Sequence, residues 1–218
     1  MSSSVLSAPI SSIGIPKEIK SDELRVAITP DGVKELVTQG LEVRVQSEAG
    51  QGVGITDNSF AEAGATIVDR DGAWSAHLVV KVKEPQEEEY KLLREDMVLL
   101  TYLHLAAYPK VGEALLKAGT TSIGYETVQM EDGTLPLLAP MSEIAGRMAV
   151  LNGAKYLEGT LGGKGKLLSG VPGVEPATVT IIGGGVVGLN AAKLAAGLGA
   201  KVNVLDISMD RLRYLDDI

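Results

Sequence analysis

Short apolar runs alternate with segments of helical periodicity along most of the chain. The pattern predicts strands near residues 13–15, 41–46, 65–68, 77–83, 97–105 and 121–125, and helices near 30–40, 60–63, 85–93 and 111–118. Pro30 and Gly40 mark the start and the end of the first helix. Because strands that alternate with helices form βαβ units, the sequence predicts an α/β fold. We expect a Rossmann-like substrate domain over residues 13–138, preceded by a Ser-rich disordered tail at 1–12.

A second α/β region is predicted over residues 139–218. Ser142 is placed at the start of a long helix that reaches Gly159, and the glycine-rich stretch 159–176 is expected to be a loop. A strand at 178–182, a helix at 187–198 and a strand at 201–205 follow. One βαβ unit takes about 30 residues, and only about 40 follow Val179. We therefore expect only the first part of a Rossmann domain, truncated before its third strand.

A glycine-rich motif joins the first strand of this region to its helix. Gly183, Gly185 and Gly188 form the pattern G-x-G-x-x-G directly after the strand 178–182. The first glycine suits a tight turn, the second lets a pyrophosphate approach the backbone, and the third lets helix and strand pack closely. Asp206 ends the next strand about 20 residues later, where an acid binds the ribose hydroxyls of NAD and repels a 2′-phosphate. A tight turn without cofactor is the alternative, but the complete order of elements favours NAD.

Composition narrows the function classes. The 218 residues carry 20 Lys and Arg against 28 Asp and Glu, a formal net charge of −8. An acidic chain repels phosphate backbones and anionic headgroups, so we expect neither nucleic-acid nor membrane partners. No cysteine and only two histidines are present, which argues against disulfides, thiolate chemistry and a resident metal. The absence of cysteine fits a cytoplasmic location.

Three polar residues follow strands of the first predicted sheet. Lys83 and His104 lie at the ends of the strands at 77–83 and 97–105, and Arg25 lies in the connection after the first strand. Ligands of open parallel sheets bind beyond the carboxyl ends of the strands, so these side chains are expected on one rim. An arginine fork binds a carboxylate, a lysine binds a carboxylate or polarises a carbonyl, and a histidine exchanges protons near neutral pH. The set is typical of a site for a small oxo or amino acid.

Each of these residues also has a structural interpretation. Lys83 would point into solvent, His104 would be a partly buried histidine bonded to backbone, and Arg25 would form a surface ion pair with Asp22 or Glu23. His77, at the other end of its strand, is expected to be structural. These three residues alone do not decide between a substrate site and a purely structural role.

At these positions the chain resembles the alanine dehydrogenases of the alanine dehydrogenase/pyridine nucleotide transhydrogenase family. The resemblance runs from about residue 13 to residue 218. It rests on specific blocks: Gly14-Ile15-Pro16-Lys17-Glu18, Arg25-Val26-Ala27-Ile28-Thr29-Pro30, Lys81-Val82-Lys83-Glu84-Pro85, Leu103-His104-Leu105-Ala106-Ala107, Tyr125-Glu126-Thr127, Pro140-Met141-Ser142-Glu143 and Gly170-Val171-Pro172-Gly173-Val174. Transhydrogenase α subunits are similar in the Arg25 block and the nucleotide fold but are not expected to carry the His104 block.

The resemblance implies an NAD-dependent oxidoreductase that interconverts L-alanine with pyruvate and ammonium. It implies that Arg25 and Lys83 hold the substrate and that His104 is the acid/base. NAD would contact the glycines Gly183, Gly185 and Gly188 together with Ser142, Val186, Val187, Asp206 and Arg211. Family members are hexamers and continue past Ile218 to supply a catalytic aspartate. Alternatives are an inactive remnant, an NAD-binding module, a transhydrogenase-like subunit, or a fold completed by a second polypeptide.

Overall fold

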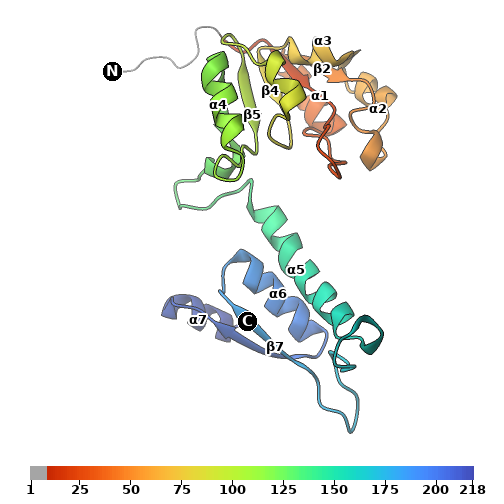
Figure 1. Cartoon of the computed structure of the whole chain (residues 1–218), viewed down its shortest axis with the longest axis vertical. Coiled ribbons are helices and arrows are strands. Elements are labelled where there is room, and N and C mark those ends of the chain that lie inside the picture. Colours follow the sequence, from red (N-terminus) through yellow and green to blue (C-terminus); the bar gives the residue numbers. More distant parts are fainter. Residues whose placement is uncertain (1–8) are drawn as a thin grey trace. The chain divides into compact units, whose positions relative to one another are not determined.

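The computed structural model describes residues 9–218, and these residues form two compact units (Figure 1). The division falls after Val128 rather than after residue 138, because Leu135 and Leu138 line a pocket with residues of the second unit. The expected disordered tail covers residues 1–8, which lie outside the described part, and residues 9–12. The prediction of disorder is wrong for Ser11 and Ser12. Ser12 begins the first strand, and the Ser11 carbonyl accepts a hydrogen bond from the Glu42 amide.

Six parallel strands in the order β3-β2-β1-β4-β5-β6 form the sheet of the first unit. They are β1 (Ser12–Ile15), β2 (Glu42–Gln46), β3 (Thr66–Val68), β4 (Leu78–Val80), β5 (Val98–Thr101) and β6 (Thr121–Gly124). This is the strand order of a Rossmann sheet. All strands are parallel, and the order in which successive strands are added reverses at the boundary between β1 and β4. The prediction of an α/β fold with a Rossmann-like parallel sheet is therefore confirmed.

Both faces of this sheet are buried. Successive side chains of a strand point to opposite faces, so Val80 and Leu100 pack into one core and Val79 and Leu99 into the other. The first core is covered by α1 (Pro30–Thr38) and α2 (Asp57–Glu62), and the second by α3 (Arg70–Trp74) and α4 (Pro109–Ala118). Figure 1 shows α4 beside β5.

Local capping explains where the structure departs from the predicted elements. Helix α3 was not predicted; it begins because the Asp69 carboxylate accepts a hydrogen bond from the Gly72 amide at 2.8 Å. The helix expected at 85–93 is a 3₁₀ helix, η2 (Glu87–Leu92). A capping box between Gln86 and Glu89 stabilises its first turn. The other 3₁₀ turns are η1 (Gln51–Val53), η3 (Tyr125–Thr127) and η4 (Gly159–Leu161).

The second unit pairs a two-stranded parallel sheet with three helices. The sheet contains β7 (Thr178–Ile182) and β8 (Lys201–Leu205), with the predicted bounds. The helices are α5 (Ala139–Tyr156), α6 (Val186–Gly197) and α7 (Met209–Asp216). Helix α6 lies along α5 (Figure 1), and a Cβ at Gly146 would stand 2.2 Å from the Val187 carbonyl. Gly146 is therefore required for this close crossing.

Ser142 does not cap α5, contrary to the prediction. The helix starts at Ala139, and the Ser142 amide already donates to the Leu138 carbonyl inside the first turn. Pro140 explains the earlier start, because the first turn is where a residue without an amide hydrogen is accommodated.

Candidate active site

The loops after β1 and β4 meet where the strand order of the first sheet reverses. Crevices of this kind, beyond the carboxyl ends of the strands, are the usual ligand sites of open parallel sheets. Arg25 lies in the loop after β1, Lys83 in the loop after β4, and His104 in the loop after β5. The topology thus places the three predicted rim residues on adjacent loops of the same sheet edge.

Lys83 and His104 lie beyond the strands rather than on them, which corrects the predicted strand ends. Strand β4 ends at Val80. The backbones of Lys81 and Val82 still bond to those of Leu100 and Tyr102, but the Val82 amide donates to the Glu18 carboxylate at 2.6 Å. In the same way, the His104 amide donates to the Glu126 carboxylate at 2.9 Å. Side-chain acceptors thus replace sheet partners and turn both segments into site loops.

Arg25 forms a two-pronged ion pair with Glu23. The Nε–Oε1 distance is 2.8 Å and the Nη2–Oε2 distance is 2.6 Å. Hydrogen bonds from Arg25, and more weakly the charge of Lys83, hold the pKa of the Glu23 carboxyl below its ordinary value. The Arg25 side chain is 45% exposed. The ion pair considered from the sequence exists, and it orients an arginine that still faces solvent.

Tyr102 links the arginine and the histidine, and the sequence analysis missed it. Its ring centroid lies 6.0 Å from that of His104 and 4.7 Å from that of Tyr125. Burial raises the pKa of the Tyr102 hydroxyl, while the nearby charge of Arg25 lowers it. Its position two residues before His104, directly after β5, was the available signal.

His104 is held by carboxylates at both its backbone and its ring. Its φ is +47°, in the left-handed region that non-glycine residues seldom adopt, and the Glu126 bond to its amide supports this conformation. Its Nδ1 lies 2.9 Å from Oε2 of Glu84, while the side chain remains 36% exposed. One side of the ring is therefore fixed and the histidine stays open to solvent.

A buried ion cluster joins the loops after β1 and β4 to η2. The Lys81 ammonium is 3.2 Å from Oε2 of Glu18 and 3.0 Å from Oε1 of Glu89, and all three side chains are at most 3% exposed. Burial raises the pKa of Glu18, although Lys81 opposes that shift. Since Glu18 also binds the Val82 amide, the cluster ties the loop after β1 to the loop after β4. Sequence analysis missed this cluster.

The glycine-rich motif of the second unit forms a tight turn between β7 and α6. Gly183 has a φ of +96°. A Cβ at Gly188 would stand 1.9 Å from the Gly183 carbonyl, whereas a Cβ at Gly185 would meet nothing within 4 Å. The first and third glycines are thus required by the backbone, and the second leaves open space at the start of α6. The free amides and dipole of that helix end attract phosphate groups.

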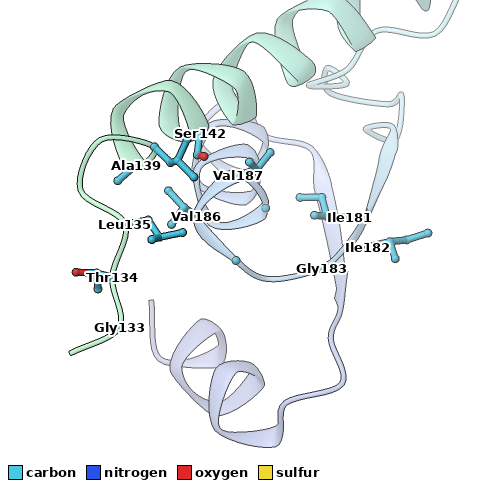
Figure 2. A pocket seen from close by; sticks show the side chains of 13 residues that line it. Gly133, Thr134, Leu135, Ala139, Ser142, Ile181, Ile182, Gly183, Val186 and Val187 are labelled. Atoms are coloured by element: carbon cyan, nitrogen blue, oxygen red, sulfur yellow. The ribbon is translucent and has the colours of Figure 1, made fainter. Parts of the chain in front are cut away.

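A pocket of about 660 Å³ opens at this turn, entirely within the second unit (Figure 2). The predicted cofactor residues that line it are Ser142, Gly183, Gly185, Val186, Val187 and Gly188. The opposite wall comes from residues 133–135 and 138–139, which the sequence analysis did not include. Those residues precede and begin α5, and no recognisable motif marks them.

Asp206 and Arg211 bind the backbone of the glycine turn from the side of β8 and α7. The Asp206 carboxylate accepts hydrogen bonds from the Ser208 amide at 2.8 Å and the Gly184 amide at 2.5 Å, and these bonds lower its pKa. Arg211 donates to the carbonyls of Gly184 and Gly185. Gly184 has no role predicted from the sequence; a Cβ there would stand 2.6 Å from Cδ1 of Leu215, so the Leu215 side chain would have to move.

No group of three or more His, Asp or Glu side chains in residues 9–218 is arranged to hold a metal ion. No helix in that range combines the length and apolar character needed to cross a membrane. His77, expected to be structural, has its Nδ1 2.9 Å from the Ser11 hydroxyl.

The two parallel sheets and the glycine turn define a two-unit protein of the Rossmann class. The family model described as alanine dehydrogenase/PNT, N-terminal domain matches residues 14–145, and the corresponding C-terminal domain model matches residues 149–218. The chain belongs to this alanine dehydrogenase/PNT family.

Relatives within the family are similar over nearly the whole chain. Alanine dehydrogenase of Bacillus subtilis (strain 168) is 57% identical over 207 residues, which are 94% of this chain and 54% of the relative. Alanine dehydrogenase of Mycobacterium tuberculosis (strain H37Rv) is 57% identical over 206 residues, 94% of this chain and 56% of the relative. The chain thus spans about half the length of these curated relatives.

Solved structures give the same result. An L-alanine dehydrogenase superposes with a TM-score of 0.89 at 51% identity, covering 94% of this chain and 57% of the other. A transhydrogenase from Sinorhizobium meliloti superposes with a TM-score of 0.80 at 26% identity, covering 94% and 62%. The chain is therefore more similar in sequence to the alanine dehydrogenase than to the transhydrogenase.

Proposed function

We propose that this chain carries the substrate site and the first part of the cofactor site of an alanine dehydrogenase, which interconverts L-alanine and NAD with pyruvate, ammonium and NADH. The observation that carries the proposal is the rim of the first sheet, where Arg25, Lys83 and His104 follow three neighbouring strands. The proposal is also supported by the two curated relatives, both of which are named alanine dehydrogenase. The proposal includes a homo-oligomer, as the family resemblance implies, and a cytoplasmic location.

Each rim residue has a role that its chemistry suits. The Arg25 guanidinium, oriented by the Glu23 carboxylate on its Nε and Nη2 edge, binds the substrate carboxylate, and Lys83 contacts the carboxylate or carbonyl oxygen. His104 moves a proton to and from the substrate as the amine is oxidised and water adds to the resulting imine. Clamping the carboxylate fixes the orientation of Cα, which must lose a hydride.

The glycine turn fits a nicotinamide dinucleotide. The open space at Gly185 and the free amides at the start of α6 suit the pyrophosphate, and the pocket adds Ser142, Val186 and Val187 as contacts. Asp206 would bind the ribose hydroxyls, with Arg211 beside it. When bound, NAD supplies the acceptor for the hydride that leaves Cα.

Replacing Arg25 with leucine tests the substrate site. We expect pyruvate binding to weaken by about 10–100-fold, because a hydrogen-bonded ion pair to the carboxylate is lost. Isothermal calorimetry of the 218-residue chain with pyruvate measures this without requiring turnover. Arg44→Leu is the matched control, since Arg44 forms the same kind of ion pair with Glu42, two residues away, on β2. Equal affinity in both variants would contradict the assignment.

Replacing Asp206 with asparagine tests the choice of cofactor. The Asp206 carboxylate is ionised at neutral pH, as an ordinary aspartate is, and backbone hydrogen bonds lower its pKa further. Its removal is expected to weaken NAD binding by about tenfold and to strengthen NADP binding, because a repelling charge disappears. Fluorescence titration with NADH and NADPH measures both affinities. Asp210→Asn, on the exposed first turn of α7, serves as control. An unchanged NAD-to-NADP preference would argue against the assignment.

A further inference from the structure

Glu84 is a buried carboxylate between two partners on the proposed substrate rim. Its side chain is 2% exposed. The Lys20 ammonium donates to Oε1, and Nδ1 of His104 lies 2.9 Å from Oε2. Each carboxylate oxygen thus has one polar side-chain partner, and Glu84 connects the loop after β1 to the loop after β5.

Lys20 keeps Glu84 ionised. The Lys20 ammonium lies 3.3 Å from the Tyr108 hydroxyl and 4.4 Å from the centre of the Tyr108 ring, so a second contact holds it in place. Burial works against both charges. Nevertheless, the bonds to Glu84 and Tyr108 raise the pKa of Lys20, and the bonds from Lys20 and His104 lower the pKa of Glu84. An ionised carboxylate accepts hydrogen bonds and donates none.

The protonation state of the His104 ring follows from this. Because Glu84 has no proton to give, the contact at 2.9 Å requires a hydrogen on Nδ1 of His104. A neutral imidazole carries one hydrogen, so Nε2 is left with a free lone pair. The other ring neighbours are aromatic: the ring centroids of Tyr102 and Tyr108 lie 6.0 Å and 6.4 Å away. Glu126 binds the backbone amide of His104.

We propose that Glu84 is a positioning residue that fixes His104 as the Nδ1–H tautomer, so that Nε2 is the atom that exchanges the proton with the substrate. This inference rests on the proposed function in assigning the proton transfer to His104. Glu84 itself touches no substrate. Fixing the tautomer through a buried carboxylate keeps the histidine ready to accept a proton at one defined atom.

The tautomer can be read directly by ¹⁵N NMR of the imidazole nitrogens at mildly alkaline pH. The chain has two histidines, so the spectrum contains His104 and one internal reference, His77, whose Nδ1 contacts the Ser11 hydroxyl. We expect the hydrogen of His104 on Nδ1 in the unmodified protein. A hydrogen on Nε2 would overturn the proposal without any variant being made.

Glu84→Gln is expected to reverse the tautomer. Lys20 would retain the oxygen of the new amide, because an ammonium only donates, and would leave the amide NH₂ facing Nδ1. The hydrogen of His104 then moves to Nε2. Where turnover is measured, kcat should fall by about 10⁴-fold with little change in KM, as expected for a wrong tautomer. An unchanged tautomer in a folded variant would overturn the proposal.

A further variant separates positioning from general damage. Glu87→Gln makes the same chemical change on an exposed side chain of η2 and should leave both histidine signals unchanged. If alanine oxidation is observed but Glu84→Gln keeps the wild-type tautomer, the proposed function stands and the positioning role falls. If the tautomer reverses in Glu84→Gln but the unmodified chain does not bind pyruvate in calorimetry, the positioning role stands and the proposed function falls.

Discussion

Replacing Lys81 with methionine is expected to lower the free energy of unfolding by about 3–5 kcal/mol, because it leaves two buried carboxylates without their cation. Lys81 is fully buried, and its ammonium lies within 3.2 Å of both Glu18 and Glu89. Methionine fills a similar volume, so the loss reports the missing charge rather than a cavity. Urea unfolding followed by circular dichroism measures the difference.

The loss should depend on pH in a defined direction. Burial already raises the pKa of Glu18, and Lys81 is the group that opposes the shift. Without Lys81 the folded-state pKa rises further above the unfolded value, so the folded variant binds more protons than the unfolded chain between the two. Its stability then falls as the pH rises through that window. The defect is therefore smaller near pH 4 than near pH 8.

Lys110→Met is the matched control for this prediction. Lys110 also forms a lysine–glutamate pair, with Glu87 at 2.9 Å, but both side chains are more than 70% exposed. Solvent screens such a pair, so its removal should leave the unfolding midpoint nearly unchanged. If the two variants unfold alike, the buried cluster does not hold the loops after β1 and β4.

The parts of the fold that were predictable from sequence are those governed by local rules. Period-two apolar runs and glycine or proline boundaries gave the strand and helix order, and β7 and β8 have the predicted bounds. The glycine spacing predicted the turn before α6 because backbone geometry alone demands glycine at Gly183 and Gly188. These features depend on residues close in sequence.

The parts that were missed depend on distant side chains. Glu18 meets Lys81, and Lys20 meets Glu84, more than 60 positions apart in the chain. Glu18, Lys81 and Glu84 stand in the family blocks, but nothing in those blocks shows which residues pair, because a buried ion pair is defined by the fold that closes it. The predicted strand ends at Lys83 and His104 failed for the same reason. Carboxylates from other loops, Glu18 and Glu126, bind the backbone amides of Val82 and His104 in place of a neighbouring strand.

Replacing His104 with asparagine is expected to reduce alanine oxidation by about 10²–10⁴-fold, the range attributed to one general acid/base, while leaving pyruvate binding largely intact. Asparagine is preferable to alanine here because His104 has a φ of +47°, a conformation that asparagine tolerates better than other non-glycine residues. The backbone of the loop is thereby kept, and the loss reports the imidazole. NADH formation from L-alanine and NAD gives the rate.

His77→Asn makes the same substitution at the other histidine of the chain, whose Nδ1 contacts the Ser11 hydroxyl away from the rim. It should oxidise alanine at the wild-type rate, and loss of that rate in His104→Asn purified in the same way excludes activity from contaminating host enzymes. Calorimetry with pyruvate completes the comparison: lost turnover with retained binding assigns His104 to proton transfer. Lost turnover together with lost binding would make His104 a substrate ligand instead, and near-normal turnover in His104→Asn would remove it from the reaction. Because Glu84 acts only through the His104 ring, that last result would also leave the Glu84 contact without a role in catalysis.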